Sequence, residues 1–337
     1  MFNNIFIFCM IFLIYHYKMP TNTFTYTTFG NRIKAASCAI ATLIVSTFGI
    51  GVTGCANSPE SASSNDKIPM VTVSIDPLRY FAEAIGGDSI EVTTLLPQGT
   101  DPETFEPGTA VMRSLAQSKS LIQIGTLPFE NALLRNVHAN NPSLAIYSVN
   151  EGIEPIYGTH THHHSEGHNH HADEADPHVW SSVKNAIIIA NNTLKALTAT
   201  APQHADYYTR RHAQLTTQLD SIDKSYTRQL AGLPSRTFVA WHPSLSYFAR
   251  DYDLTQIALN AENKETSPRR IHQLLEKANS QRPLAFIIPT DMSPNQFEST
   301  AEALSLHPTA ISFMSSNWQL DMQTLVNALT GTSNKKQ

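Results

Sequence analysis

Histidines dominate one stretch of this 337-residue chain, between residues 158 and 180. Its first part holds seven of them: His160, His162, His163, His164, His168, His170 and His171. Neutral imidazole is a good ligand for zinc, copper, nickel and iron, and near neutral pH most of it is already deprotonated. The tract is internal and interrupted, unlike an engineered tag. We predict a metal-binding loop over residues 158–175, with a solvated loop of no role as the alternative.

A single histidine follows in a more constrained frame, Asp176-Pro177-His178-Val179-Trp180. Unlike the preceding tract, which has almost no apolar residues to bury, this motif contains a proline, a valine and a tryptophan. His178 is therefore predicted to be a fixed ligand in a built site. The alternative is a histidine satisfied inside the core.

The N-terminal region has the pattern of an export leader. Basic residues precede an apolar run over residues 35–52, which ends in Val52-Thr53-Gly54-Cys55. This order predicts a leader over residues 1–54, and the ending resembles the lipobox of bacterial lipoproteins, in which the cysteine carries the lipid. A buried core thiol is the alternative for Cys55. Because Met19 offers a second start, we hypothesise that translation begins there and that residues 1–18 are a mis-annotated extension. Residues 55–67 are expected to form a flexible tether.

Cysteine positions and charge exclude several classes of protein. The cysteines are Cys9, Cys38 and Cys55, so the chain after the leader can form no internal disulfide and no Cys₄ zinc site. Any metal must be held by His, Asp or Glu. The net charge of −5 gives no reason to expect a nucleic-acid partner. No apolar run after the leader is long enough to span a membrane, so lipid on Cys55 would be the membrane contact.

Short apolar runs alternate with helical patterns in two separate parts of the chain. The expected strands cover residues 70–75, 90–96, 121–124 and 144–149, then 237–241, 255–259, 284–288 and 309–313. Such alternation predicts mostly parallel sheets flanked by helices. Between the two parts, Ser181 or Ser182 caps one helix, and Pro202 opens a helix of about 30 residues and about 45 Å.

The predicted fold class is therefore α/β, with two similar lobes joined by one long connecting helix. The expected boundaries are residues 68–181 for the first lobe, 182–234 for the connecting helices and 235–337 for the second lobe. Ligands of open α/β sheets bind beyond the carboxyl ends of the strands. Three segments with donor atoms lie at such ends: residues 95–107, 238–243 and 287–291.

Several motifs in this order carry a family resemblance. They are the lipobox, Asp101-Pro102-Glu103-Thr104-Phe105-Glu106-Pro107, the histidine-rich tract, Asp176-Pro177-His178-Val179-Trp180, His242 with Tyr247-Phe248, and Lys264-Glu265-Thr266-Ser267-Pro268. Together they resemble the metal-binding lipoproteins of bacterial ABC importers for zinc and manganese, and are most similar to the zinc-uptake branch. The resemblance implies two lobes with a metal clamped between them.

The resemblance also implies a ligand set. His178 matches the second ligand and His242 the third, while the first position, a histidine in many relatives, is Glu103 here. A carboxylate can ligate zinc, but it also hardens the site and could favour manganese or iron(II). Glu106 is the alternative to Glu103. From the second lobe, Asp291 is the candidate fourth ligand, with a plain helix-start acid as its alternative.

The remaining candidates are expected to have structural roles. Glu265 is interpreted as a helix-capping or structural acid. The isolated histidines are expected on the surface or in packing: His138, His204, His212, His272 and His307.

The function implied is capture of a divalent metal outside the cytoplasm, with Zn²⁺ first and Mn²⁺ or Fe²⁺ as alternatives. The protein would be a non-enzymatic, lipid-anchored monomer on the periplasmic or cell-surface side, delivering its ion to an ABC permease in the cytoplasmic membrane. The histidine-rich loop could concentrate zinc or sense it. A zinc hydrolase is the rival from another class, although the chain has no His-Glu-x-x-His helix. A surface adhesin with a metal site is the third interpretation.

Overall fold

A computed structural model of the chain describes residues 68–157, 175–260 and 266–332. All of them belong to one compact unit, residues 64–337. The predictions for the leader, Cys55, the tether, the histidines of residues 160–171 and Glu265 lie outside the described residues. Among the residues that the structure describes, no helix is long and apolar enough to cross a membrane.

The first lobe is built on a four-stranded parallel sheet in the order β2-β1-β3-β4. Its strands are β1 (Met70–Val73), β2 (Glu91–Thr94), β3 (Ser120–Gln123) and β4 (Ala145–Ser148). The accompanying helices are α2 (Asp76–Gly86), α3 (Thr109–Leu115) and α4 (Pro128–Asn140). Strand β3 is buried along its whole length, as expected for a central strand of a sheet covered on both faces.

The second lobe repeats this plan with the order β6-β5-β7-β8, again all parallel. Its strands are β5 (Thr237–Ala240), β6 (Thr255–Ala258), β7 (Phe286–Pro289) and β8 (Pro308–Ile311). Its helices are α7 (Ser246–Asp251), α8 (Pro268–Ser280), α9 (Glu298–Leu304) and α10 (Trp318–Thr330). The matching strand orders confirm the prediction of two similar α/β lobes.

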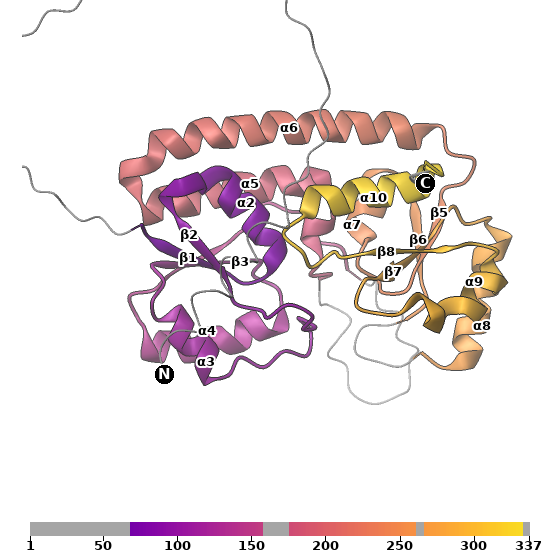
Figure 1. Cartoon of the computed structure of the whole chain (residues 1–337), viewed down its shortest axis with the longest axis horizontal. Coiled ribbons are helices and arrows are strands. Elements are labelled where there is room, and N and C mark those ends of the chain that lie inside the picture. The colour runs from indigo at the N-terminus through magenta and orange to yellow at the C-terminus, as the bar shows by residue number, and fades with distance from the viewer. Residues whose placement is uncertain (1–67, 158–174, 261–265, 333–337) are drawn as a thin grey trace, which may run out of the picture. The chain divides into compact units, whose positions relative to one another are not determined.

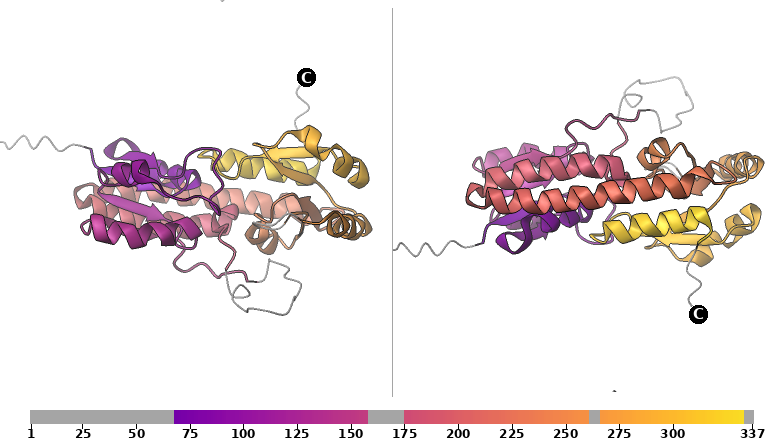
Figure 2. Two further views of the ribbon diagram at one scale, coloured as in Figure 1. Left: turned by 90° about the horizontal axis from the view of Figure 1, so that it is seen from below. Right: turned by 90° about the horizontal axis from the view of Figure 1, so that it is seen from above.

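Two helices connect the lobes. The Ser182 hydroxyl accepts a hydrogen bond from the Asn185 amide and caps α5 (Val183–Thr200), one of the two caps expected. A 3₁₀ turn at Pro202–His204 then leads into α6 (Ala205–Ala231), a helix of 27 residues. Figure 1 shows α6 running along both lobes, and Figure 2 shows it beside α5 and α10. The long connecting helix is thus confirmed.

One apolar core continues from the first lobe into the second. It includes Phe81 and Leu121 from the first lobe, Phe248 from the second, and Trp180 and Trp318. A smaller cluster occupies another face of the second sheet: Val239, Ile257, Leu259, Ala278, Phe286, Ile288, Phe297 and Leu304. Successive side chains of a strand point to opposite faces of the sheet, so the strands of the second lobe contribute to both clusters. The lobes are therefore joined by packed side chains of the shared core as well as by α6.

Candidate metal centre

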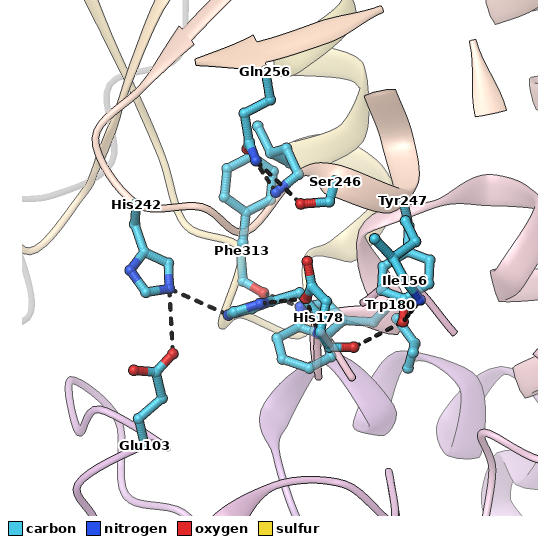
Figure 3. Close-up of polar contacts among 12 residues, drawn as sticks. Glu103, Ile156, His178, Trp180, His242, Ser246, Tyr247, Gln256 and Phe313 are labelled. Carbon is cyan, nitrogen blue, oxygen red and sulfur yellow. Dashed lines mark hydrogen bonds and ion pairs between the residues drawn. The ribbon is translucent and has the colours of Figure 1, made fainter. Parts of the chain in front are cut away.

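Three side chains from separate parts of the chain meet in space. Glu103 lies in the loop after β2, His178 precedes the short 3₁₀ helix before α5, and His242 comes two residues after β5. One ligand atom from each of the three lies within 4.8 Å of the others. Figure 3 shows the Glu103 carboxylate and the two imidazoles turned toward one another.

The distances suit a single bound ion. Nε2 of His242 lies 3.2 Å from Nε2 of His178 and 3.6 Å from Oε1 of Glu103. Two nitrogens that each bind one zinc ion at about 2.0–2.1 Å, in tetrahedral geometry, lie about 3.3 Å apart. The three donors therefore already converge as ligands of one ion do.

The three ligands differ in their exposure to solvent. The Glu103 side chain is 5% exposed and His178 is buried, whereas the His242 side chain is 32% exposed. A carboxylate removed from water is strongly stabilised by a nearby cation. Because His242 is the most exposed of the three ligands, an ion can enter the site from its side.

Asp176 fixes the orientation of the His178 ring. Its Oδ1 accepts a hydrogen bond from the His178 amide at 2.9 Å and lies 2.8 Å from Nδ1 of the same ring. Burial opposes a charge on Asp176, but the contacts with His178 together with the Ser246 hydroxyl hold the pKa of the carboxyl below its ordinary value. The ionised carboxylate keeps the proton on Nδ1 and turns the lone pair of Nε2 toward the other ligands.

The backbone around His178 is tied to both lobes. The Tyr247 hydroxyl donates to the Asp176 carbonyl at 2.8 Å and accepts from the Ile156 amide at 3.3 Å. The Trp180 indole donates to the Phe313 carbonyl at 2.8 Å, and the Trp318 indole donates to the Trp180 carbonyl at 2.6 Å. His178 therefore sits on a rigid support.

A cavity of about 540 Å³ opens beside the three ligands, and His178 and His242 form part of its wall. Most of the wall comes from the second lobe, where strand ends and the segments after them line it: Trp241 follows β5, Asn260 follows β6, residues 290–292 follow β7 and residues 312–315 follow β8. The first lobe contributes residues 98–102. The cavity thus lies beyond the carboxyl ends of the strands, where the sequence places the donor segments.

The structure brings Glu103, His178 and His242 together, and the other predicted candidates stay outside this group. Glu106 is exposed and does not join it. Asp291 lines the cavity as an exposed residue but lies outside the group of three, so its role as fourth ligand stays a prediction. The isolated histidines with described side chains also lie outside the group; they are His204, His212, His272 and His307.

Sequence reasoning missed the part that Asp176 plays. The signal was present, because an acid two residues before a histidine can accept bonds from both its amide and its ring. The Tyr247 contact had no such local signal, because 71 residues separate it from Asp176.

Comparisons with known proteins identify the family of the chain. Residues 71–330 match the family model of ZnuA, zinc-uptake complex component A periplasmic. A putative metal-binding protein of Treponema pallidum (strain Nichols) is 30% identical over 227 residues, which are 65% of this chain and 71% of that protein. The manganese ABC transporter substrate-binding lipoprotein PsaA of Streptococcus pneumoniae is 27% identical over 255 residues, 73% of this chain and 78% of that protein.

A crystal structure of ZnuA has the same fold. It superposes with a TM-score of 0.70 at 28% sequence identity, covering 79% of this chain and 99% of that chain. The family consists of transport substrate-binding proteins, which confirms the prediction that the chain is not an enzyme. In this chain, Glu103, His178 and His242 form the candidate site for a divalent metal ion. With this site and a family match over residues 71–330, the chain belongs to the ZnuA family of periplasmic metal-binding proteins.

Proposed function

We propose that the protein binds zinc outside the cytoplasm and delivers it to the membrane permease of an ABC importer. The observation that carries the proposal is the convergence of two imidazole nitrogens and one carboxylate oxygen within 4.8 Å. The ion is the cargo, and it leaves the protein chemically unchanged, since zinc has no redox step.

Zinc suits this donor set better than manganese does. Two imidazoles, one carboxylate and a water complete the four-coordinate, N-rich site that zinc favours, whereas manganese prefers a larger number of oxygen ligands. Among the described residues, the group contains one carboxylate, that of Glu103.

Manganese is the second candidate, and the oxygen donors at the site favour it. The first ligand is the carboxylate of Glu103, and Asp291 on the cavity wall could add a second oxygen. The relative from Streptococcus pneumoniae is named as a manganese ABC transporter substrate-binding lipoprotein. Iron(II) would be favoured by the same oxygens.

The remaining features of the proposal concern the cell. Names of relatives that are lipoproteins support lipidation of Cys55 and a place outside the cytoplasmic membrane. The histidines of residues 160–171 would act as an accessory collector or sensor of zinc. A monomer suffices, because all three ligands come from one chain.

Competition titration of the metal-free protein with Zn²⁺, Mn²⁺ and Fe²⁺ tests the choice of metal. Glu103→Gln keeps the shape of the side chain and removes its charge, so zinc affinity should fall about tenfold to a hundredfold, or about 1–3 kcal/mol. Glu106→Gln, three residues away and exposed, is the matched control and should bind as the wild type does.

Two outcomes of the titration would count against the proposal. Equal zinc affinity in Glu103→Gln and Glu106→Gln would remove Glu103 from the site. Manganese binding tighter than zinc binding would assign the protein to the second candidate.

Uptake requires a test in cells. A strain that lacks the gene should grow poorly in zinc-depleted medium, and the wild-type gene should restore growth while His178→Gln does not. Full rescue by a His178→Gln protein present at normal abundance would contradict delivery through this site.

A further inference from the structure

The cavity beside the metal centre is much larger than one ion requires. An ion and a water that completes its coordination need little more than the roughly 30 Å³ of the water itself. The cavity holds about 540 Å³, within the range of about 300–1,000 Å³ typical of sites for small organic molecules. Space therefore remains for a ligand that accompanies the ion.

The position of the cavity allows that ligand to touch the ion. Nε2 of His178 and Nε2 of His242, 3.2 Å apart, belong to residues that line the cavity, while Glu103 does not line it. An ion held by the three donors thus turns its remaining coordination positions toward the cavity. Zinc can accept one donor there, or two if it becomes five-coordinate.

The charges of the wall select the kind of ligand. Asp101 and Asp291 both line the cavity, and the described residues of the wall include no lysine and no arginine. An anionic zinc complex, such as that of citrate, would meet like charges, which disfavours it. A zinc complex that keeps a net positive charge would meet opposite charges.

The other wall residues suit an amino acid with an aromatic side chain. Two aromatic residues, Trp241 and Phe313, line the cavity, and an imidazole ring packs well against aromatic side chains. The Asn260 amide and the Ser312 hydroxyl supply donors for a carboxylate. Free histidine has an imidazole ring and a carboxylate that fit these wall residues, and its amine and imidazole nitrogens can both bind zinc.

We propose that the site takes up its metal as a one-to-one complex with a free amino acid of the histidine type, which completes the coordination from the cavity side. The amine and imidazole nitrogens of the amino acid bind the ion, and the amine releases its proton to solvent. The complex carries one positive charge and matches the acidic wall. This inference rests on the proposed function, since it requires a zinc site at Glu103, His178 and His242.

Native mass spectrometry of the purified full chain tests the inference directly. The metal-free protein is given Zn²⁺ alone, L-histidine alone, Zn²⁺ with L-histidine, or Zn²⁺ with citrate. We expect a species that carries one zinc and one histidine, no histidine without zinc, and no species with citrate. Transfer of zinc from the protein to an added chelator should also be about tenfold slower with histidine present than without it, a change of about 1.4 kcal/mol.

Two variants separate the cavity from other zinc-binding parts of the chain. Thr290→Trp fills the cavity from an exposed position on its wall and should abolish histidine retention while zinc affinity stays within about twofold. Thr217→Trp adds the same side chain at an exposed position of α6 that does not line the cavity, and should behave as the wild type does.

The outcomes keep the two proposals distinguishable. If histidine only strips zinc from the protein, or if the ternary species persists in Thr290→Trp, the inference is wrong and the zinc site stands. If no zinc binds under any condition, both proposals fail.

Discussion

At the scale of single residues, Asp176 decides whether His178 is ready to bind. Its contact with Nδ1 of the ring, at 2.8 Å, sets the tautomer in which Nε2 is free of a proton. Asp176→Asn preserves the shape but offers an amide that can present its NH₂ group to the ring. We expect zinc affinity to fall about tenfold to a hundredfold, as for other partners of metal-binding histidines.

Titration of metal-free Asp176→Asn with zinc measures this loss, and circular dichroism checks that the fold is kept. Asp220→Asn, at an exposed acid of α6 that does not line the cavity, is a control of equal charge change. An affinity that falls equally in both variants would point to a general charge effect and contradict the orienting role.

Asp291 is the residue whose predicted role needs its own measurement. It lies on the cavity wall, exposed and outside the group of three ligands. If it is the fourth ligand, Asp291→Asn should weaken manganese more than zinc, because manganese depends more on oxygen donors. Paired titrations of the two metals test this, and an unchanged ratio of the two affinities would leave the fourth position to water or to another ligand.

The sequence predicted Glu103, His178 and His242 because each lies in a motif or at a strand end where donors gather. It could not separate the exposed Glu106 from Glu103 by pattern alone, since that choice depends on which side chain the loop turns inward. Asp291 shows the same limit: position at a strand end places a residue on the cavity wall but does not fix its distance from an ion.

At the scale of elements, α7 holds the support of the site in place. Tyr247 on α7 bonds to the Asp176 carbonyl and the Ile156 amide, and burial raises the pKa of its hydroxyl to about 12. An acid with a raised pKa binds its proton more tightly in the folded state. Stability from this group is therefore complete below about pH 10 and is lost as the pH rises through about 12.

Tyr247→Phe removes both the hydrogen bonds and this titration. We expect it to lower the free energy of unfolding by about 1–3 kcal/mol near pH 7, and the difference from wild type to shrink above about pH 10. Urea unfolding at several pH values measures the effect. Tyr157→Phe, at a tyrosine that is 60% exposed, is the matched control. A loss that stays constant with pH would contradict the titration of Tyr247.

The elements themselves were largely predictable, because periodicity is a local property. The five apolar positions of α6 that are buried, Tyr208, Leu215, Leu219, Tyr226 and Leu230, follow the spacing read from the sequence. The contact of Trp318 with Trp180 was not predictable in this way, because it joins residues 138 positions apart.

At the scale of the whole described unit, the shared core limits how the lobes can move. Trp180 and Trp318 bond to each other and belong to the apolar core that includes residues of both lobes. Opening the lobes widely would expose this core to water at a cost of roughly 25 cal/mol for each Å² of apolar surface. Metal binding is therefore expected to adjust loops at the cavity more than to swing one lobe against the other.

This expectation leads to a measurable pattern of stability. If zinc binds the folded chain as proposed, a free concentration of about 100 times Kd should add about 2.7 kcal/mol to the free energy of unfolding. Because the lobes share a core, calorimetry should show one transition that shifts upward with zinc and returns with a chelator, and the radius of gyration should change by less than about 1 Å. His178→Gln should unfold in one transition without the shift. Two transitions, of which zinc moves only one, would show that the lobes unfold separately and that the shared core does not couple them.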